Sequence, residues 1–141
     1  MPKIIIDSRE QTALVIPNSV RRCLRYGDYS LDGYEHAVSI ERKSHGDLLG
    51  SITAGRERLE RELFHLAQMD YPALVIEATI NDILRGHPQS RMNPRAALCT
   101  LLSWSVKYRL PVFFTSGPIQ AAKVTEYLLN AYARYWGNDE E

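Results

Sequence analysis

Residues 27–43 read GDYSLDGYEHAVSIERK, a stretch that combines a single carboxylate with an acid-x-lysine unit. The carboxylate is Asp28, and the unit runs from Glu41 to Lys43, beginning thirteen residues farther along the chain. Apolar residues alternate with smaller or polar ones before this unit, which predicts a strand at 37–43. Because side chains two residues apart on a strand point to the same face, Glu41 and Lys43 would lie together.

Two carboxylates beside a lysine can form a metal-dependent site that cleaves phosphodiesters. Carboxylate oxygens and a few waters suit a hard cation such as Mg²⁺, which polarises a phosphoryl group and activates water. A lysine ammonium adds a compact positive charge where negative charge develops. Taken alone, Asp28, Glu41 and Lys43 favour a solvated strand with a local ion pair over a catalytic role, and the neighbouring motifs have to decide between the two.

The loop between Asp28 and Glu41 decides whether the two carboxylates can meet. A two-residue turn at 32–33 would set Asp28 opposite Ala37 and leave Glu41 about 13 Å farther along the strand. That separation is too long for one shared ion. A four-residue loop over 33–36 would instead place Asp28 directly opposite Glu41. We therefore predict the longer loop, or a bulged equivalent, despite the local turn signal.

Four short motifs occur in order along the first part of the chain. They are IIIDSRE at 4–10, GDY at 27–29, IERKSHGDL at 40–48 and SITAGR at 51–56. In this order they resemble the nuclease domain of the XPF family of structure-specific DNA endonucleases. The resemblance implies an α/β, restriction-endonuclease-like fold of the PD-(D/E)XK superfamily, with a mixed central sheet flanked by helices. It also implies Mg²⁺- or Mn²⁺-dependent incision of branched, forked or flapped DNA.

The resemblance assigns roles to individual positions of this sequence. Asp28 and Glu41 would be metal ligands, and Lys43 the catalytic lysine. Asp7, Arg9 and Glu10 would be accessory members of the acidic cluster, and Arg42 and Asp47 supporting catalytic residues. Gly55 and Arg56, together with Arg42, would contact DNA, since the free amides at a helix start favour a phosphate.

Three of these roles have structural alternatives. Arg42 should point away from Glu41 and Lys43 on a regular strand, so a structural ion pair competes with catalysis. A carboxylate at Asp47 would be stabilised by the dipole of a helix N-terminus without taking part in the reaction. Arg56 would equally fit a solvated residue in the first turn of a helix.

Size and composition fit one ordinary soluble domain. With 141 residues and 45% hydrophobic content, residues 1–141 predict a single domain with a frayed tail at 137–141. Two cysteines are too few for a disulfide framework, and no run approaches the roughly 20 apolar residues of a membrane span. We therefore expect a cytoplasmic protein that is neither secreted nor bound to a membrane. The seventeen acidic and seventeen basic residues cancel, so no overall positive charge indicates nucleic acid.

Hydrophobic periodicity predicts strands that alternate with helices, which is the pattern of an α/β layer fold. Strands are expected at 3–7, 19–25, 28–32, 37–43, 73–76 and 112–114. A helical pattern runs from Asp47 to about Tyr71, and a short helix follows between a cap at Thr79 or Asn81 and Gly86. Two longer helices start at Pro94 and at 117–118, with Leu102 and Tyr135 in their apolar stripes.

Several functional alternatives stay open. One is a Holliday-junction resolvase or restriction-type nuclease with the same core, and another is a non-catalytic DNA-binding or dimerisation subunit. The helix-hairpin-helix module that usually follows an XPF nuclease domain has no room here, so a partner could supply DNA binding. Aromatic residues gather from Tyr127 to Trp136 and, with the resemblance, favour a homodimer through the last two helices.

Overall fold

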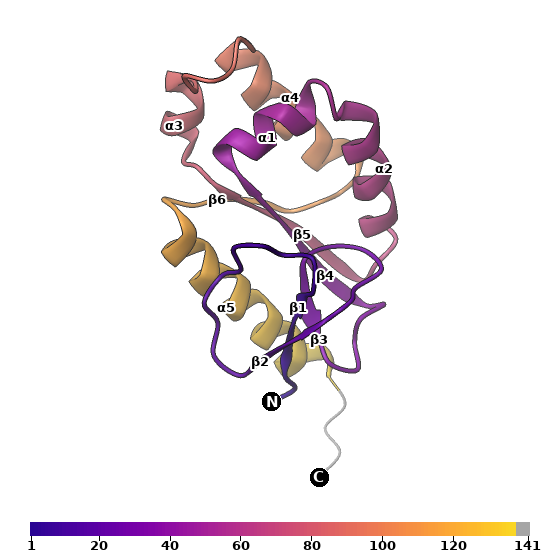
Figure 1. The fold of residues 1–141 in the computed structure, drawn as a ribbon. Helices are drawn as coiled ribbons and strands as arrows, with labels where there is room; N and C mark the ends of the chain where they lie inside the picture. The colour runs from indigo at the N-terminus through magenta and orange to yellow at the C-terminus, as the bar shows by residue number, and fades with distance from the viewer. Residues whose placement is uncertain (138–141) are drawn as a thin grey trace.

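Six strands form one mixed sheet with helices on both faces (Figure 1). This computed structural model describes residues 1–137. The strands are β1 (Ile4–Asp7), β2 (Ser19–Arg22), β3 (Tyr29–Leu31), β4 (Val38–Ser44), β5 (Tyr71–Glu77) and β6 (Val112–Phe114). The helices are α1 (His45–Ile52), α2 (Arg56–Leu66), α3 (Ile80–Arg85), α4 (Pro94–Lys107) and α5 (Pro118–Trp136). The tail expected at 137–141 lies outside the described residues except for Gly137.

The sheet runs in the order β2-β1-β3-β4-β5-β6 and contains both pairing directions. β1 pairs parallel with β2 and antiparallel with β3, and β3 pairs antiparallel with β4. β4, β5 and β6 are parallel, and helices connect them as parallel pairing requires. The mixed central sheet flanked by helices was predicted, and it is confirmed.

Each face of the sheet has its own hydrophobic core. On one face, Ala73 and Val75 of β5 pack in a cluster with Leu129 of α5. On the other face, Leu74 and Ile76 pack in a cluster with residues of α1, α2 and α4. β5 is therefore apolar on both sides, as is typical of a central parallel strand. In Figure 1, α1 to α4 lie on one side of the sheet and α5 lies across the other.

The β3–β4 hairpin adopts the register of the longer loop. Tyr29 pairs with Ile40, and the backbone N–H of Asp28 donates to the carbonyl of Ile40 at 2.9 Å. Continuing this register by one residue sets Asp28 opposite Glu41. The longer loop is confirmed by the pairing of Tyr29 with Ile40, while Asp28 lies just before β3 and outside the paired ladder.

The turn at 32–33 also forms, but it does not close the hairpin. The N–H of Tyr34 donates to the carbonyl of Leu31 at 3.0 Å, and Gly33 has a φ of 87°, a value that favours glycine. A second turn follows, in which the N–H of Ala37 donates to the carbonyl of Tyr34 at 2.9 Å. Two successive turns therefore satisfy the local turn signal and still give the longer loop.

Some predicted bounds were wrong. β2 ends at Arg22 rather than at residue 25, and β5 begins at Tyr71, so Pro72 lies in a strand. The helical pattern from Asp47 to Tyr71 is divided into α1 and α2 by a break at 53–55. Pro72 is tolerated because it is the second residue of β5, and the pairing of β5 with β6 begins only at Leu74.

Two residues predicted in apolar stripes are exposed. Leu102 is 46% exposed and Tyr135 is 70% exposed, whereas Trp104 and Tyr132 are buried at 4% and 8%. The buried face of α4 is set by Ala97, Leu101 and Trp104, a helical spacing that turns position 102 outward. Within the described residues, none of the helices combines the length and the apolar character needed to cross a membrane.

Candidate active site

Strand alternation puts Asp28, Glu41 and Lys43 on the face of the sheet that α1 to α4 partly cover. Tyr29 and Ile40 belong to the core beneath α5, so their neighbours Asp28 and Glu41 point to the opposite face. Lys43 follows Glu41 by two residues, and its Nζ lies 3.3 Å from Glu41 Oε2. The three side chains predicted to carry the chemistry therefore share one face.

A cleft of about 260 Å³ opens over these side chains. It is lined by Asp7, Arg9, Glu10, Arg25, Tyr26, Gly27, Asp28, Glu41, Lys43 and Glu62. Most of these residues come from the first four strands and the loops between them, whereas Glu62 comes from α2. The structure thus brings together six of the predicted site residues, namely Asp7, Arg9, Glu10, Asp28, Glu41 and Lys43.

Asp28 is a carboxyl group whose surroundings make it a weak acid. Burial raises the pKa of Asp28 to about 7, and the carboxylates of Glu10 and Asp7 add to the increase. The backbone N–H of Arg42, which donates to Asp28 Oδ2 at 2.8 Å, and the charge of Lys43 lower this pKa and only partly offset the burial. In the absence of a cation, Asp28 therefore keeps its proton to a higher pH than an ordinary aspartic acid does.

Glu41 and Lys43 form a buried ion pair, and Lys43 is surrounded by more than one carboxyl group. Burial raises the pKa of Glu41 well above its ordinary value, and Asp28 adds to the increase while Lys43 opposes it. Burial alone would lower the pKa of Lys43, but Glu41, Glu62 and Asp28 together raise it above its ordinary value. The lysine therefore stays charged, while the two facing carboxyl groups resist ionising together.

Asp7 and Arg9 brace the rim of the cleft. Arg9 Nε donates to Asp7 Oδ2 at 2.9 Å, and the N–H of Leu24 donates to Asp7 Oδ1 at 2.8 Å. Arg9 Nη2 also donates to the Leu24 carbonyl at 2.6 Å. Burial would raise the pKa of Asp7, but the hydrogen bonds from Arg9 and Leu24 outweigh it and lower that pKa. This ionised pair ties the end of β1 to the segment that leads into Asp28.

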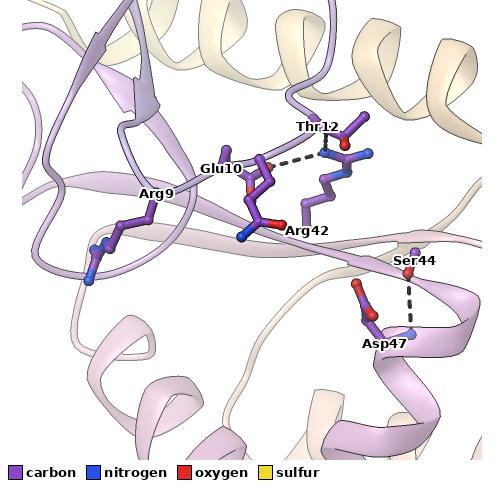
Figure 2. Close-up of a pocket in the computed structure, with 7 residues that line it drawn as sticks. Arg9, Glu10, Thr12, Arg42, Ser44 and Asp47 are labelled. Atoms are coloured by element: carbon purple, nitrogen blue, oxygen red, sulfur yellow. Dashed lines mark hydrogen bonds and ion pairs between the residues drawn. The ribbon is translucent and has the colours of Figure 1, made fainter.

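Arg42 lies on the opposite face of β4, as strand alternation predicts. Its guanidinium donates to Glu10 Oε2 at 3.2 Å, to Glu77 Oε2 and to the carbonyl of Thr12. Figure 2 shows Arg42 reaching Glu10 and Thr12. Tyr29 donates its hydroxyl hydrogen to Glu10 Oε2 at 2.7 Å. These contacts favour the structural role for the Arg42 side chain, because they fasten the loop after β1 to the sheet.

Besides Arg42, three predicted site residues lie outside the cleft. Asp47 is exposed in the first turn of α1, beside a second, polar hollow (Figure 2). Gly55 precedes α2, and Arg56 pairs with Glu60 at 3.6 Å and lies 5.2 Å from the ring centroid of Trp104. The roles of Asp47 in catalysis and of Gly55 and Arg56 in DNA binding stay predictions.

The family description that matches this chain is the ERCC4 domain, over residues 6–128. The chain belongs to the ERCC4 domain family. Its structure is similar to that of XPF from Aeropyrum pernix, with a TM-score of 0.77 at 21% identity, covering 99% of this chain and 65% of that chain. A structure of XPF from Aeropyrum pernix in complex with DNA gives 0.75 at 20% identity, covering 99% and 68%. A comparison with curated proteins found no match.

These similarities confirm the family and the fold that the motifs predicted. At 20–21% identity, the superposition shows that this ERCC4 domain has the restriction-endonuclease-like architecture. The chain spans 65% of the length of the first XPF structure. The activity, substrates and partners of the full-length XPF proteins are therefore only proposals for this chain.

The cleft of this ERCC4 domain fits a divalent cation held by few side chains. Asp28 and Glu41 repel each other in a buried site, and a cation bound between them would let both ionise. Among the residues that the structure describes, no group of three or more histidine, cysteine or acidic side chains is arranged to hold a metal. The two carboxyl groups of Asp28 and Glu41 are oxygen donors, which suit a hard cation that keeps several waters, as Mg²⁺ does.

Glu62 is the acidic cleft residue that sequence analysis missed. Arg58 precedes it by four residues on α2, and this spacing predicts an ion pair on the outer surface. In the structure, Glu62 lines the cleft and raises the pKa of both Glu41 and Lys43. No local signal separates the two outcomes, because only the tertiary fold brings α2 over β4.

Proposed function

We propose that this ERCC4 domain is a Mg²⁺- or Mn²⁺-dependent endonuclease that hydrolyses phosphodiester bonds in branched, forked or flapped DNA. The observation that carries the proposal is the opposition of two carboxyl groups, Asp28 and Glu41, beside Lys43 in an open cleft. A structural ion pair would not need a second carboxyl group facing it. Such like-charge pairs cost stability, and they are typical of functional sites.

Each side chain of the cleft has a distinct task in this proposal. Asp28 and Glu41 would hold the cation, which when bound polarises the phosphoryl group and activates water. The N–H of Arg42 fixes the orientation of Asp28 through its hydrogen bond to Oδ2. The ammonium group of Lys43, kept charged by its acidic neighbours, stabilises the negative charge that develops on the phosphoryl oxygens.

DNA is the proposed substrate because of the family and because a similar XPF structure was solved in complex with DNA. The test is to incubate the purified protein with Mg²⁺ or Mn²⁺ and linear, flapped, forked and four-way DNA. We expect incision near the branch points, and none in EDTA. Sequence-specific cleavage of linear duplex would favour a restriction-type enzyme, and preference for the four-way junction a resolvase. Inertness on every substrate would favour a non-catalytic subunit.

We also propose that the protein acts as a homodimer formed through α4 and α5, with a further partner supplying a DNA-binding module if one is needed. Large apolar side chains are exposed on both helices, namely Leu102, Val106, Tyr127, Tyr135 and Trp136. α4 contacts β6, which is the last strand in the sheet order. Exposed aromatic and aliphatic side chains are typical of protein interfaces. Because α4 and α5 lie on opposite faces of the sheet, the proposed contact would include the β6 edge of the sheet.

A further inference from the structure

We propose that Arg25, Tyr26, Phe64 and His65 form a stacking platform for unpaired bases of a DNA strand. The inference rests on the proposed function, because it assumes that a phosphodiester of that strand lies in the cleft. It goes beyond that function by assigning a base-contacting surface beside the cleft.

The stacking platform joins two segments that are far apart in the sequence. The rings of Tyr26 and His65 are stacked, with centroids 4.5 Å apart and an angle of 13° between their planes. The guanidinium of Arg25 lies 5.4 Å from the centroid of the Tyr26 ring. The ring of Phe64 meets that of His65 edge to face, with centroids 5.7 Å apart. An arginine and three rings thus form one continuous set of π-surfaces.

The outer members of the platform are open to solvent. Phe64 is 55% exposed, and Arg25 and His65 are also exposed. The buried face of α2 consists of Leu59, Leu63 and Leu66, so packing of the helix does not require an aromatic side chain at position 64. A large exposed ring beside a stacked pair is available to a flat ligand.

The platform is continuous with the proposed active site. Arg25 and Tyr26 line the same cleft as Asp28 and Glu41. A phosphodiester held at the two carboxyl groups would bring its neighbouring nucleotides to the rim of the cleft, where the platform lies. Every base has two π-faces that can stack on aromatic side chains, and arginine adds a cation–π contribution.

Pairing state decides which DNA can use this surface. In a regular duplex the bases stack on one another and their faces are closed, whereas an unpaired strand can turn its bases outward. The chain carries no net charge, so contacts with bases would add affinity that overall electrostatic attraction does not supply. The platform therefore favours a strand that is single-stranded beside the scissile phosphate.

The test compares two oligonucleotides that differ only in their bases. One is a fluorescein-labelled thymidine strand, and the other is a strand of equal length in which every nucleotide is abasic. Fluorescence anisotropy in EDTA, which prevents cleavage, gives the dissociation constant of each strand. We expect the wild-type protein to bind the thymidine strand more tightly by roughly 5-fold or more.

Variants of the platform residues test whether the platform causes the tighter binding of the thymidine strand. Phe64→Ala and His65→Ala should each reduce the ratio of the two dissociation constants, whereas Phe64→Trp should keep it. Val15→Ala is the control, because Val15 is 91% exposed in the loop between β1 and β2. Thermal melting followed by circular dichroism checks that the variants stay folded.

The outcomes separate this inference from the nuclease proposal. A preference for bases that is lost in Phe64→Ala supports the platform, whether or not the protein cuts DNA. Equal binding of both strands by the wild-type protein overturns it, even if the protein cuts DNA. A preference that is unchanged in both alanine variants also overturns it, and would leave the exposed rings to a protein partner.

Discussion

Glu41 takes part in both interactions proposed for the cleft. Its carboxyl group lies near that of Asp28 and forms an ion pair with the ammonium group of Lys43. Glu41→Gln keeps the size of the side chain and removes its charge. We expect this variant to lose incision completely, and Lys43→Ala to lower the incision rate by about 100-fold or more. The rate on a flapped substrate with Mg²⁺ measures both effects.

The fold should tolerate these substitutions. In EDTA the melting temperature of Glu41→Gln should stay close to that of the wild-type protein, because the loss of repulsion from Asp28 offsets the loss of the ion pair with Lys43. Glu57→Gln is the matched control, since Glu57 is an exposed residue of α2 that does not line the cleft, and it should cut normally. Incision at the wild-type rate by Glu41→Gln or by Lys43→Ala would remove that residue from the mechanism.

Asp28 should give the protein without metal a characteristic pH dependence. The pKa of Asp28 is about 7 in the folded protein, above the ordinary value of 3.8, so the folded state binds the proton more tightly than the unfolded state. The stability that this proton contributes is complete below about pH 4 and is lost as the pH rises through about 7. Melting temperatures in EDTA should therefore fall over this window in the wild-type protein, and fall less in Asp28→Asn. Parallel curves for the two proteins would contradict the raised pKa.

At the scale of elements, the entry into β3 depends on Gly27. This residue has a φ of 83°, and a Cβ added to it would lie 1.9 Å from Ser39 Oγ. Gly33 has a similar φ of 87°, but a Cβ there would meet nothing within 4 Å. Alanine at either position costs about 1–2 kcal/mol for the left-handed backbone, and overpacking adds about 1–3 kcal/mol at Gly27.

These two glycines form a matched pair for a test of the hairpin. Gly27→Ala should lower the free energy of unfolding by more than Gly33→Ala does, as measured by urea denaturation. It should also lower incision, because displacement of the chain at residue 27 moves Asp28 relative to Glu41. Equal losses in the two variants would show that the contact with Ser39 is not important.

Elements with strong local signals were predictable from the sequence. Thr79 caps α3 in a capping box with Asp82, and Pro94 occupies the first position of α4. The register of β3 and β4 followed from a chemical requirement, since one cation can be shared only if the two carboxylates face each other. A helix start at Gly55 and Arg56 was predicted, and α2 begins at Arg56, whereas the end of α1 at Ile52 was not predicted.

Contacts between segments that are far apart in the chain could not be predicted from the sequence. Glu62 carries the same local pattern whether it faces solvent or the cleft, and the position of α2 over the sheet decides between the two. The stacking of Tyr26 on His65 joins residues 39 positions apart, so no periodicity could indicate it. The cleft could thus be predicted where one hairpin builds it, and not where tertiary packing completes it.

At the scale of the whole molecule, the exposed apolar surface of α4 and α5 predicts a homodimer. Sedimentation velocity at high micromolar concentration should give the mass of two chains. Trp136 is 74% exposed, and Trp136→Glu should shift the protein toward the monomer, whereas Val15→Glu, on an equally exposed loop residue, should not. A strictly monomeric mass for the wild-type protein at this concentration would rule out the dimer.

The central claim is that Asp28 and Glu41 together hold one catalytic cation. A titration with Mn²⁺, followed by the loss of the electron paramagnetic resonance signal of the free ion, tests it without any DNA substrate. We predict that the wild-type protein binds Mn²⁺, that Asp28→Asn and Glu41→Gln each lose the same site, and that Glu57→Gln keeps it. Undiminished Mn²⁺ binding in either of the first two variants would contradict the shared site and the mechanism built on it.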